Sequence, residues 1–272
     1  MPVPHRSSGR HAGFWSFDFP WAILDVRKGL TMSERAGFRQ NFLLAALPTA
    51  DYKRFTAGLK SVKLSLGASV YKADVPLAYA YFPTTAIVSM VSEMVNGDTA
   101  EIAITGNDGM VGTPLIMGGT KSPNDAIVQC AGRAYRITAR ALRAELDRNG
   151  ALRNLTLHYA QALMTQMTQT VLCNRHHPVT QQLCRWLLLS LDRLPSNVVL
   201  MTDGLVANML GVRLRGVVTA AGKLQAEGII KYHDGRITVL NRAKMEKRVC
   251  ACYKIVRDEE TRLLPQKSGT LA

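Results

Sequence analysis

Residues 202–240 read TDGLVANMLGVRLRGVVTAAGKLQAEGIIKYHDGRITVL, a stretch that predicts two short helices followed by a β-hairpin. Gly211 supplies the positive φ of a tight turn between the helices, and Ala207 is small enough to let the helices cross. The apolar residues of this corner are Val206, Leu210, Val212, Val217 and Ala220. The layout is that of a helix-turn-helix, whose second helix lies in a major groove of DNA.

Basic and polar side chains remain for the outer face of the second helix. Two arginines near its start can form bidentate hydrogen bonds with guanine, whereas a lysine two turns further along is expected to contact phosphate. For each side chain, the alternative is a solvated role or a contact with phosphate alone. The predicted DNA-binding residues, including two cations of the hairpin, are Thr202, Arg213, Arg215, Gly216, Thr219, Lys223, Lys231 and Arg236.

The charge balance agrees with a polyanionic partner. The chain has 34 Lys and Arg against 20 Asp and Glu, a net charge of +14. Between Arg175 and Arg257 there are 14 basic and 5 acidic side chains, so most of the excess accompanies the helix-turn-helix, as phosphate binding requires. The alternative is a basic surface that serves solubility. No apolar run approaches the about 20 residues that span a bilayer, so we expect a cytoplasmic protein without membrane association.

The cysteines predict reduced thiols. Their number is odd and they are scattered, which suits a reducing compartment better than a disulfide framework. Cys250 and Cys252 form a close pair, but a metal or redox role needs further ligands, and the sequence offers none obvious nearby. His176 and His177 are adjacent and would point apart on a helix. We therefore expect no metal and no cofactor.

The first half of the chain predicts an antiparallel β-roll. Residues 1–35 read as a disordered extension, of which 1–31 precede a second possible start at Met32. Short helices are expected over 42–47 and 50–58. Short alternating runs with turn signals then cover 60–138, including a hairpin turn at 96–98. The roll domain is placed at 36–150.

A long helix is expected over 151–176, because the segment to Asn174 has no proline or glycine. Its apolar stripe suits a dimer seam, since symmetric DNA-binding proteins need two recognition helices about one DNA turn apart. The alternative is that the stripe packs on the chain's own roll, and both can hold for different residues. The DNA-binding domain follows at 177–248, starting with a helix over 179–194, and a tail at 249–272. The predicted seam residues are Leu152, Leu155, Tyr159, Leu163, Met167 and Val171.

The order of roll, long helix and winged helix-turn-helix resembles the Crp/Fnr superfamily of bacterial transcription factors. The resemblance spans about Phe38 to Glu246 and is most specific in 205–232, in GRITVLNRAKME (235–246) and in GNDGMVG (106–112). It implies an α+β fold with a cyclic-nucleotide-binding-like jelly roll at the N-terminus. It also implies a homodimer that binds a pseudo-palindromic operator in double-stranded DNA, with RNA polymerase as a partner if the protein is an activator.

The sequence departs from this family at the effector site. Where cyclic-nucleotide-binding members have Gly-Glu-x-Gly, this chain has methionine at the glutamate position, and the segment comparable to their phosphate-binding arginine holds Asn124 and Asp125. A buried phosphate without a cationic partner is costly, so we predict that cyclic AMP is not bound by the usual contacts. The sequence does not identify the effector, which is a small molecule, a protein contact or absent altogether. The candidate pocket residues are Met110, Val111, Gly112, Asn124 and Asp125.

The sequence does not support the other cofactors of the superfamily either. No cysteine precedes Cys130, which argues against an N-terminal iron–sulfur cluster, and 60–138 contain no histidine to hold haem. Leu214 occupies a common arginine position of the recognition helix, so the operator sequence cannot be copied from relatives.

The prediction for function is a sequence-specific transcriptional regulator with no catalytic residues. One alternative is a cupin-like metal-dependent enzyme, which needs histidines beside carboxylates such as Glu93, Asp98 and Glu101, and the roll has none. The other is a module that binds nucleic acid without sequence preference. A short symmetric footprint on DNA would favour the regulator, and uniform protection would favour the module.

Overall fold

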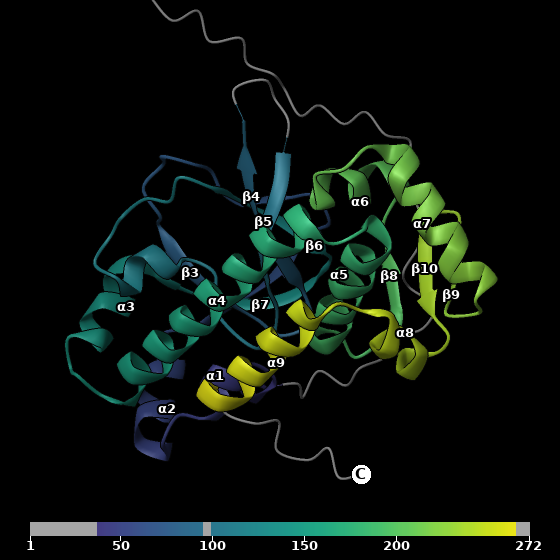
Figure 1. The fold of residues 1–272 in the computed structure, drawn as a ribbon. Helices are drawn as coiled ribbons and strands as arrows, with labels where there is room; N and C mark the ends of the chain where they lie inside the picture. Colours follow the sequence, from purple (N-terminus) through teal and green to yellow (C-terminus); the bar gives the residue numbers. More distant parts are fainter. Residues whose placement is uncertain (1–36, 95–98, 265–272) are drawn as a thin grey trace, which may run out of the picture. The chain divides into compact units, whose positions relative to one another are not determined.

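Two antiparallel sheets form the β-roll (Figure 1). The computed structural model describes residues 37–94 and 99–264, so the predicted N-terminal extension and the hairpin turn at 96–98 lie outside it. One sheet has the order β1-β7-β3 and the other β2-β6-β4-β5. This arrangement confirms the predicted antiparallel roll of the α+β fold class. The strands are β1 (Lys60–Leu64), β2 (Ser69–Tyr71), β3 (Tyr79–Pro83), β4 (Ile87–Glu93), β5 (Thr99–Thr105), β6 (Asp125–Cys130) and β7 (Gly132–Thr138).

Apolar side chains of the strands alternate into the roll. Ala80 and Phe82 of β3 are fully buried, as is Met110 in the loop after β5. Short helical segments flank these strands, and one 3-10 helix lies between β5 and β6. They are the 3-10 helices η1 (Phe38–Gln40) and η2 (Thr113–Ile116) and the helices α1 (Phe42–Ala45), α2 (Thr49–Thr56) and α3 (Ala139–Leu146).

Helix α4 (Ala151–His176) lies against the roll. The Gln166 side chain pairs with the backbone of Ile104 on β5: its Oε1 accepts from the Ile104 N–H at 2.7 Å, and its Nε2 donates to the Ile104 carbonyl at 3.2 Å. Tyr159 hydrogen-bonds Thr105 through their hydroxyls at 2.7 Å. A Cβ at Gly109 would lie 2.0 Å from the Tyr159 ring, so only glycine lets this turn approach α4 so closely.

The C-terminal part is a winged helix-turn-helix, as predicted. Its sheet has the order β8-β10-β9, and β8 adds a third strand that the sequence did not reveal because it is only three residues long. The elements are α5 (Val179–Arg193), β8 (Val198–Leu200), α6 (Asp203–Leu210), α7 (Leu214–Ala226), β9 (Ile230–His233), β10 (Arg236–Val239) and α8 (Arg242–Arg248).

The segment from 249, predicted as a tail, contains a further helix, α9 (Ala251–Leu263). In Figure 1, α9 (yellow) lies alongside α4, and the two helices are in contact. The Gln161 Nε2 atom of α4 donates to the Glu259 Oε1 atom of α9 at 3.2 Å. Within 37–94 and 99–264, no helix is both long and apolar enough to cross a bilayer.

Candidate nucleic-acid interface

The corner between α6 and α7 is built by local sequence. Thr202 caps α6, where its hydroxyl accepts from the Leu205 N–H at 3.4 Å. The chain then turns at Gly211 with φ 63°, a left-handed conformation that favours glycine. Val206 and Leu210 of α6 are buried with the inner face of α7, which is made by Val217, Ala220, Ala221 and Leu224. The hydrophobic contact therefore holds α7 at a fixed angle to α6.

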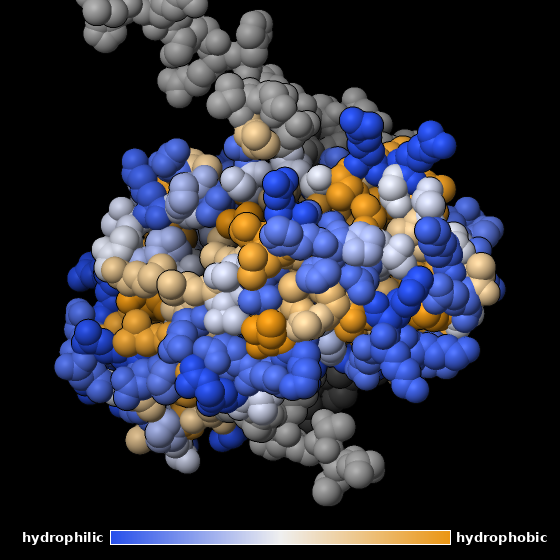
Figure 2. All heavy atoms as spheres, in the orientation of Figure 1, coloured by the Kyte–Doolittle hydropathy of each residue, from blue (hydrophilic) through white to orange (hydrophobic). Residues whose placement is uncertain are grey.

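The outer face of α7 carries the predicted cations. Arg213 at the N-cap, Arg215, Thr219 and Lys223 are all exposed. Figure 2 shows strongly hydrophilic side chains protruding where α7 begins, at the upper right.

Two apolar side chains of α7, Leu214 and Val218, are also exposed. Neither was predicted from the sequence as a contact with DNA. Val218 directly precedes Thr219, and apolar groups on a recognition helix can meet the methyl groups of thymine. Both residues are therefore further candidates for base contacts.

Gly216 lies differently from the other predicted contact residues. It is half-buried, and a Cβ at this position would lie 3.6 Å from the Val179 Cγ2 atom at the start of α5. This glycine therefore faces the helix-turn-helix core more than solvent. Its contact with DNA stays a prediction.

The hairpin of β9 and β10 presents its cations on one face. Its register pairs Arg236 with His233 and Lys231 with Thr238, so these four side chains share a face. The opposite face holds Ile230, Ile237 and Val239, which are buried. Lys231 and Arg236 are exposed, as phosphate contacts require.

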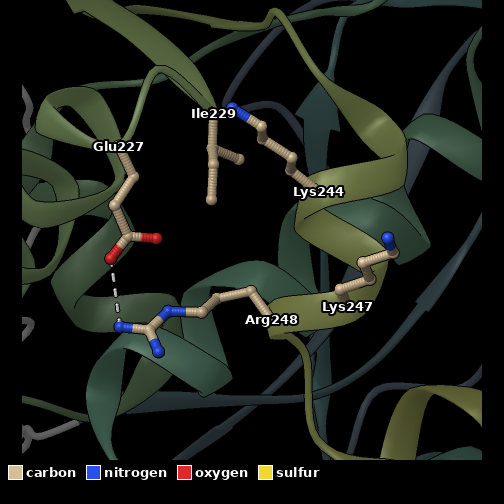
Figure 3. Close-up of a pocket in the computed structure, with 5 residues that line it drawn as sticks. All are labelled: Glu227, Ile229, Lys244, Lys247 and Arg248. Atoms are coloured by element: carbon tan, nitrogen blue, oxygen red, sulfur yellow. Dashed lines mark hydrogen bonds and ion pairs between the residues drawn. The ribbon is translucent and has the colours of Figure 1, made fainter.

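A basic groove lies between the end of α7 and α8 (Figure 3). Arg248 pairs with Glu227 across it, with Nη2 3.1 Å from Oε1. Lys244 and Lys247 of α8 also line it, together with Ile229. These cations were not among the predicted contacts, although the run Arg242–Arg248 signals a basic helix. They add positive charge to the same domain.

The candidate effector residues of the loop after β5 belong to the roll core. Met110 is fully buried, and the backbone of Val111 pairs with that of Tyr81, with N···O distances of 2.8 and 3.0 Å. Gly112 follows and is buried as well. The Met110 and Val111 side chains therefore fill the interior, and none of the three residues offers a carboxylate to a ribose.

The second candidate segment lies at the start of β6. The Asp125 Oδ1 atom accepts from the Ala73 N–H at 2.6 Å, and the Asn124 N–H donates to the Ser122 hydroxyl at 3.1 Å. Asp125 thus has a structural partner within the roll. Val111 and Ala126 belong to one hydrophobic cluster, so both candidate segments border the same part of the core.

The structure divides the predicted seam residues of α4 between two environments. Five of them, Leu152, Leu155, Tyr159, Leu163 and Met167, pack in or against the chain's own core, as the alternative interpretation expected. Val171 is 66% exposed. The other exposed apolar residues of α4 are Leu157, Met164 and Leu172, none of which was predicted for the seam. Leu157, Met164 and Val171 are seven residues apart and define a second face, called here the outer stripe.

A buried carboxylate lies where the roll meets the helix-turn-helix domain. Glu101 of β5 accepts a hydrogen bond from the Ser89 hydroxyl at 2.6 Å. Gln129 of β6 hydrogen-bonds Ser89 and also donates to the Ser190 hydroxyl of α5 at 3.2 Å, which links both domains. Burial raises the pKa of Glu101 to about 7, although the Ser89 hydrogen bond and the charges of Arg185 and Arg193 oppose the shift.

Replacing Glu101 with glutamine is expected to remove a pH dependence of stability. A carboxyl whose folded pKa is raised stabilises the fold below its unfolded pKa, and this contribution is lost as pH rises through 7. Relative to the wild type, Glu101→Gln should therefore gain roughly 2–3 kcal/mol in free energy of unfolding between about pH 4 and pH 8. Urea denaturation across this range measures it. The control is Glu93→Gln, at an exposed site on β4. If the free energy of unfolding depended on pH in the same way in both variants, the raised pKa of Glu101 would be contradicted.

Comparison with known proteins identifies the helix-turn-helix domain by its sequence and the fold by its similarity to solved structures. Residues 181–248 match the family model of the Crp-like helix-turn-helix domain. A transcriptional regulator of the Crp/Fnr family from Eubacterium rectale superposes with a TM-score of 0.60 at 15% identity, over 77% of this chain and 98% of that one. FixK2 from Bradyrhizobium japonicum superposes with a TM-score of 0.60 at 16% identity, over 71% of this chain and 98% of FixK2. A CRP-family regulator from Thermus thermophilus superposes with a TM-score of 0.55 at 15% identity, over 68% of this chain and 95% of that one. No curated protein sequence matches.

Proposed function

We propose that this chain, whose fold and helix-turn-helix domain are those of the Crp/Fnr regulators, is a sequence-specific DNA-binding transcriptional regulator. The observation that carries the proposal is the outer face of α7, where Arg213, Arg215, Thr219 and Lys223 are exposed opposite a buried apolar face. Such a helix can enter a major groove while its inner face stays packed. No catalytic step is proposed.

The roles of the cations follow from their positions. Arg213 and Arg215 lie at the start of α7, where side chains of a recognition helix meet base edges, so they are proposed to bind guanine O6 and N7. Lys223, further along α7, and Lys231 and Arg236 of the hairpin are proposed to bind phosphates. The two arginines of α7 would determine the sequence preference, and the three phosphate-binding cations would contribute to affinity for any sequence.

The operator is proposed to be bound by a homodimer joined along the outer stripe of α4. From Asn154 to Asn174 this helix contains no Lys, Arg, Asp or Glu. The exposed Leu157, Met164 and Val171 follow each other at heptad spacing, the pattern of a helix that pairs with a second helix. In Figure 2, hydrophobic side chains alternate with hydrophilic ones along α4. A second copy would cover these groups and present a second α7.

The roll is proposed to regulate DNA binding without the usual cyclic AMP contacts. Met110 fills the core where a ribose-binding carboxylate would be needed, and Asp125 would repel a phosphate. An enzyme of the cupin type finds less support, because Glu101 is buried against Ser89 and the roll strands have no histidine.

Two substitutions on α7 are expected to separate base reading from phosphate binding. Arg215→Ala should cost about 1–3 kcal/mol on the preferred operator and relax the preference at one base pair of each half-site. Lys223→Ala should weaken binding to all sequences alike and lower the slope of log affinity against log salt by about 1 for each phosphate that is no longer neutralised. Site selection from random duplexes, followed by titrations at several salt concentrations, measures both effects.

The matched control is Lys121→Ala, which removes an exposed cation from the roll and should change neither property. An unchanged site profile for Arg215→Ala would contradict its role at a base. Uniform protection of DNA by the wild type, without any selected sequence, would instead support a nonspecific nucleic-acid-binding module.

A further inference from the structure

Four soft ligands meet where α4 ends and α9 begins. Cys173 lies in the last turn of α4, and His177 follows four residues later at its C-cap. Cys250 is the N-cap of α9, and Cys252 lies in its first turn. The ligand atoms of these four residues all lie within 4.8 Å of one another. The local sequence offered no partners for the Cys250–Cys252 pair, but the fold supplies two from α4.

Two distances within this cluster match those of a tetrahedral metal site. Zinc–sulfur bonds of about 2.3 Å place two thiolates of a tetrahedron about 3.8 Å apart, and zinc–nitrogen bonds of about 2.0–2.1 Å place a sulfur and a nitrogen about 3.5 Å apart. The Cys173 and Cys250 Sγ atoms are 3.6 Å apart. The Cys252 Sγ atom lies 3.6 Å from the His177 Nδ1 atom. Both separations leave room for an ion between the ligands.

The surroundings hold the ligands in place. Cys173, Cys250 and Cys252 are buried, which excludes water, and His177 is half-buried. The His177 carbonyl accepts a hydrogen bond from the Gln182 Nε2 atom at 2.8 Å, which fixes the backbone at the end of α4. Pro178 then directs the chain into α5. The cluster is thus anchored by α4, α5 and α9 together.

A buried cation beside the cluster matches the charge that a metal complex would have. Arg185 of α5 is 4% exposed, and its Nε atom has no hydrogen-bond partner among the described residues. Its Nη1 atom donates a hydrogen bond to the Thr170 hydroxyl at 3.2 Å, so the guanidinium contacts α4 about one turn before Cys173. Three thiolates, a neutral imidazole and Zn²⁺ have a net charge of −1, which a neighbouring guanidinium would compensate.

We propose that Cys173, His177, Cys250 and Cys252 bind one Zn²⁺ in a closed tetrahedral site. Binding replaces the thiol protons of the three cysteines and releases them to solvent, while His177 coordinates through Nδ1 in its neutral form. A closed site with four protein ligands is structural rather than catalytic. The ion joins the end of α4 to the start of α9 and so fixes the helix that packs along α4.

A disulfide between Cys173 and Cys250 explains the geometry less well. Its sulfur atoms would have to approach to about 2.0 Å, and Cys252 and His177 would have no function in it. The two interpretations differ in what they need: the disulfide forms by oxidation, whereas the zinc site needs reduced thiols.

The test uses the full chain, produced with Zn²⁺ in the medium, kept under a thiol reductant and freed of any histidine tag. The protein is first purified by gel filtration. Inductively coupled plasma mass spectrometry, together with a protein assay, should then give one zinc per chain. Exchange of Zn²⁺ for Co²⁺ should give the intense visible bands of tetrahedral cobalt together with thiolate-to-cobalt charge transfer. Zinc added to the metal-free protein should raise its melting temperature.

The variants distinguish this site from adventitious zinc. Cys252→Ser and His177→Ala should lose most of the zinc and the cobalt bands, whereas Cys130→Ser, a thiol on β6 outside the cluster, should retain both. Equal zinc content in wild type and Cys252→Ser would overturn the proposal. So would wild-type protein with little zinc, or a Cys173–Cys250 disulfide that persists in peptide mapping of zinc-replete, reduced protein.

Discussion

Replacing Arg193 with alanine is expected to lower the free energy of unfolding by about 3–5 kcal/mol. This arginine, at the end of α5, is 1% exposed. Its Nη2 atom lies 2.7 Å from the Asp108 Oδ2 atom of the roll and 2.6 Å from the Glu260 Oε1 atom of α9. Removal of the guanidinium leaves two mostly buried carboxylates without the cation that bridges them, which is the costly way to break a buried ion pair.

Urea denaturation near neutral pH measures this loss, and Arg175→Ala, which removes an exposed arginine of α4, is the control. Glu260→Gln added to Arg193→Ala should restore part of the stability, because it removes one of the stranded charges. The loss should also shrink as the pH is lowered, since burial raises the pKa of the Glu260 carboxyl, which can then take up a proton. A cost no greater than that of Arg175→Ala would show that the buried network contributes little.

Introducing a carboxylate at Met164 is expected to separate the proposed dimer and lower operator affinity by about 10²–10⁴-fold. Met164 is 63% exposed and lies at the centre of the outer stripe. Two glutamates there would face each other across the two-fold axis in an apolar seam, where burial of unpaired like charges is unfavourable. Each half-site would then be bound by a separate chain, and the gain from linking two recognition helices would disappear.

Sedimentation velocity and DNA titration of Met164→Glu measure the two consequences. Met117→Glu introduces the same charge at a similarly exposed methionine of the roll and should leave mass and affinity unchanged. A wild type that sediments as a single chain would refute the dimer. If Met164→Glu still sedimented as a dimer, α4 would not form the seam.

The features encoded by neighbouring residues could be predicted from the sequence. The helix-turn-helix was recognisable because Gly211 must adopt positive φ and because the apolar spacing around it is short-range. The buried face of α4 was harder to predict, because this helix has two apolar stripes. The outer stripe of Leu157, Met164 and Val171 has the same helical period as the buried one. Which stripe packs on the roll is decided by tertiary contacts.

Long-range features were beyond the sequence alone. Cys173 and Cys250 are separated by 77 positions, and nothing in either local sequence indicates the other. The same holds for Asp108, Arg193 and Glu260, which come from three separate segments of the chain.

Helix α9 was missed because its local signal is weak. Tyr253 and Val256 have helical spacing and are both buried, but the many charged residues around them resembled a solvated tail. The contact with α4 is what makes this segment part of the fold, and no local pattern encodes that contact.

The position of α9 has a consequence for synthesis. Among the described elements it leaves the ribosome after all others, yet it supplies Glu260 to Arg193 and covers part of α4. A nascent chain that has not reached residue 251 therefore holds Arg193 with one fewer carboxylate and leaves apolar surface uncovered. Chains that end before this point would expose that surface to chaperones and proteases. Only chains that include α9 would therefore complete the fold.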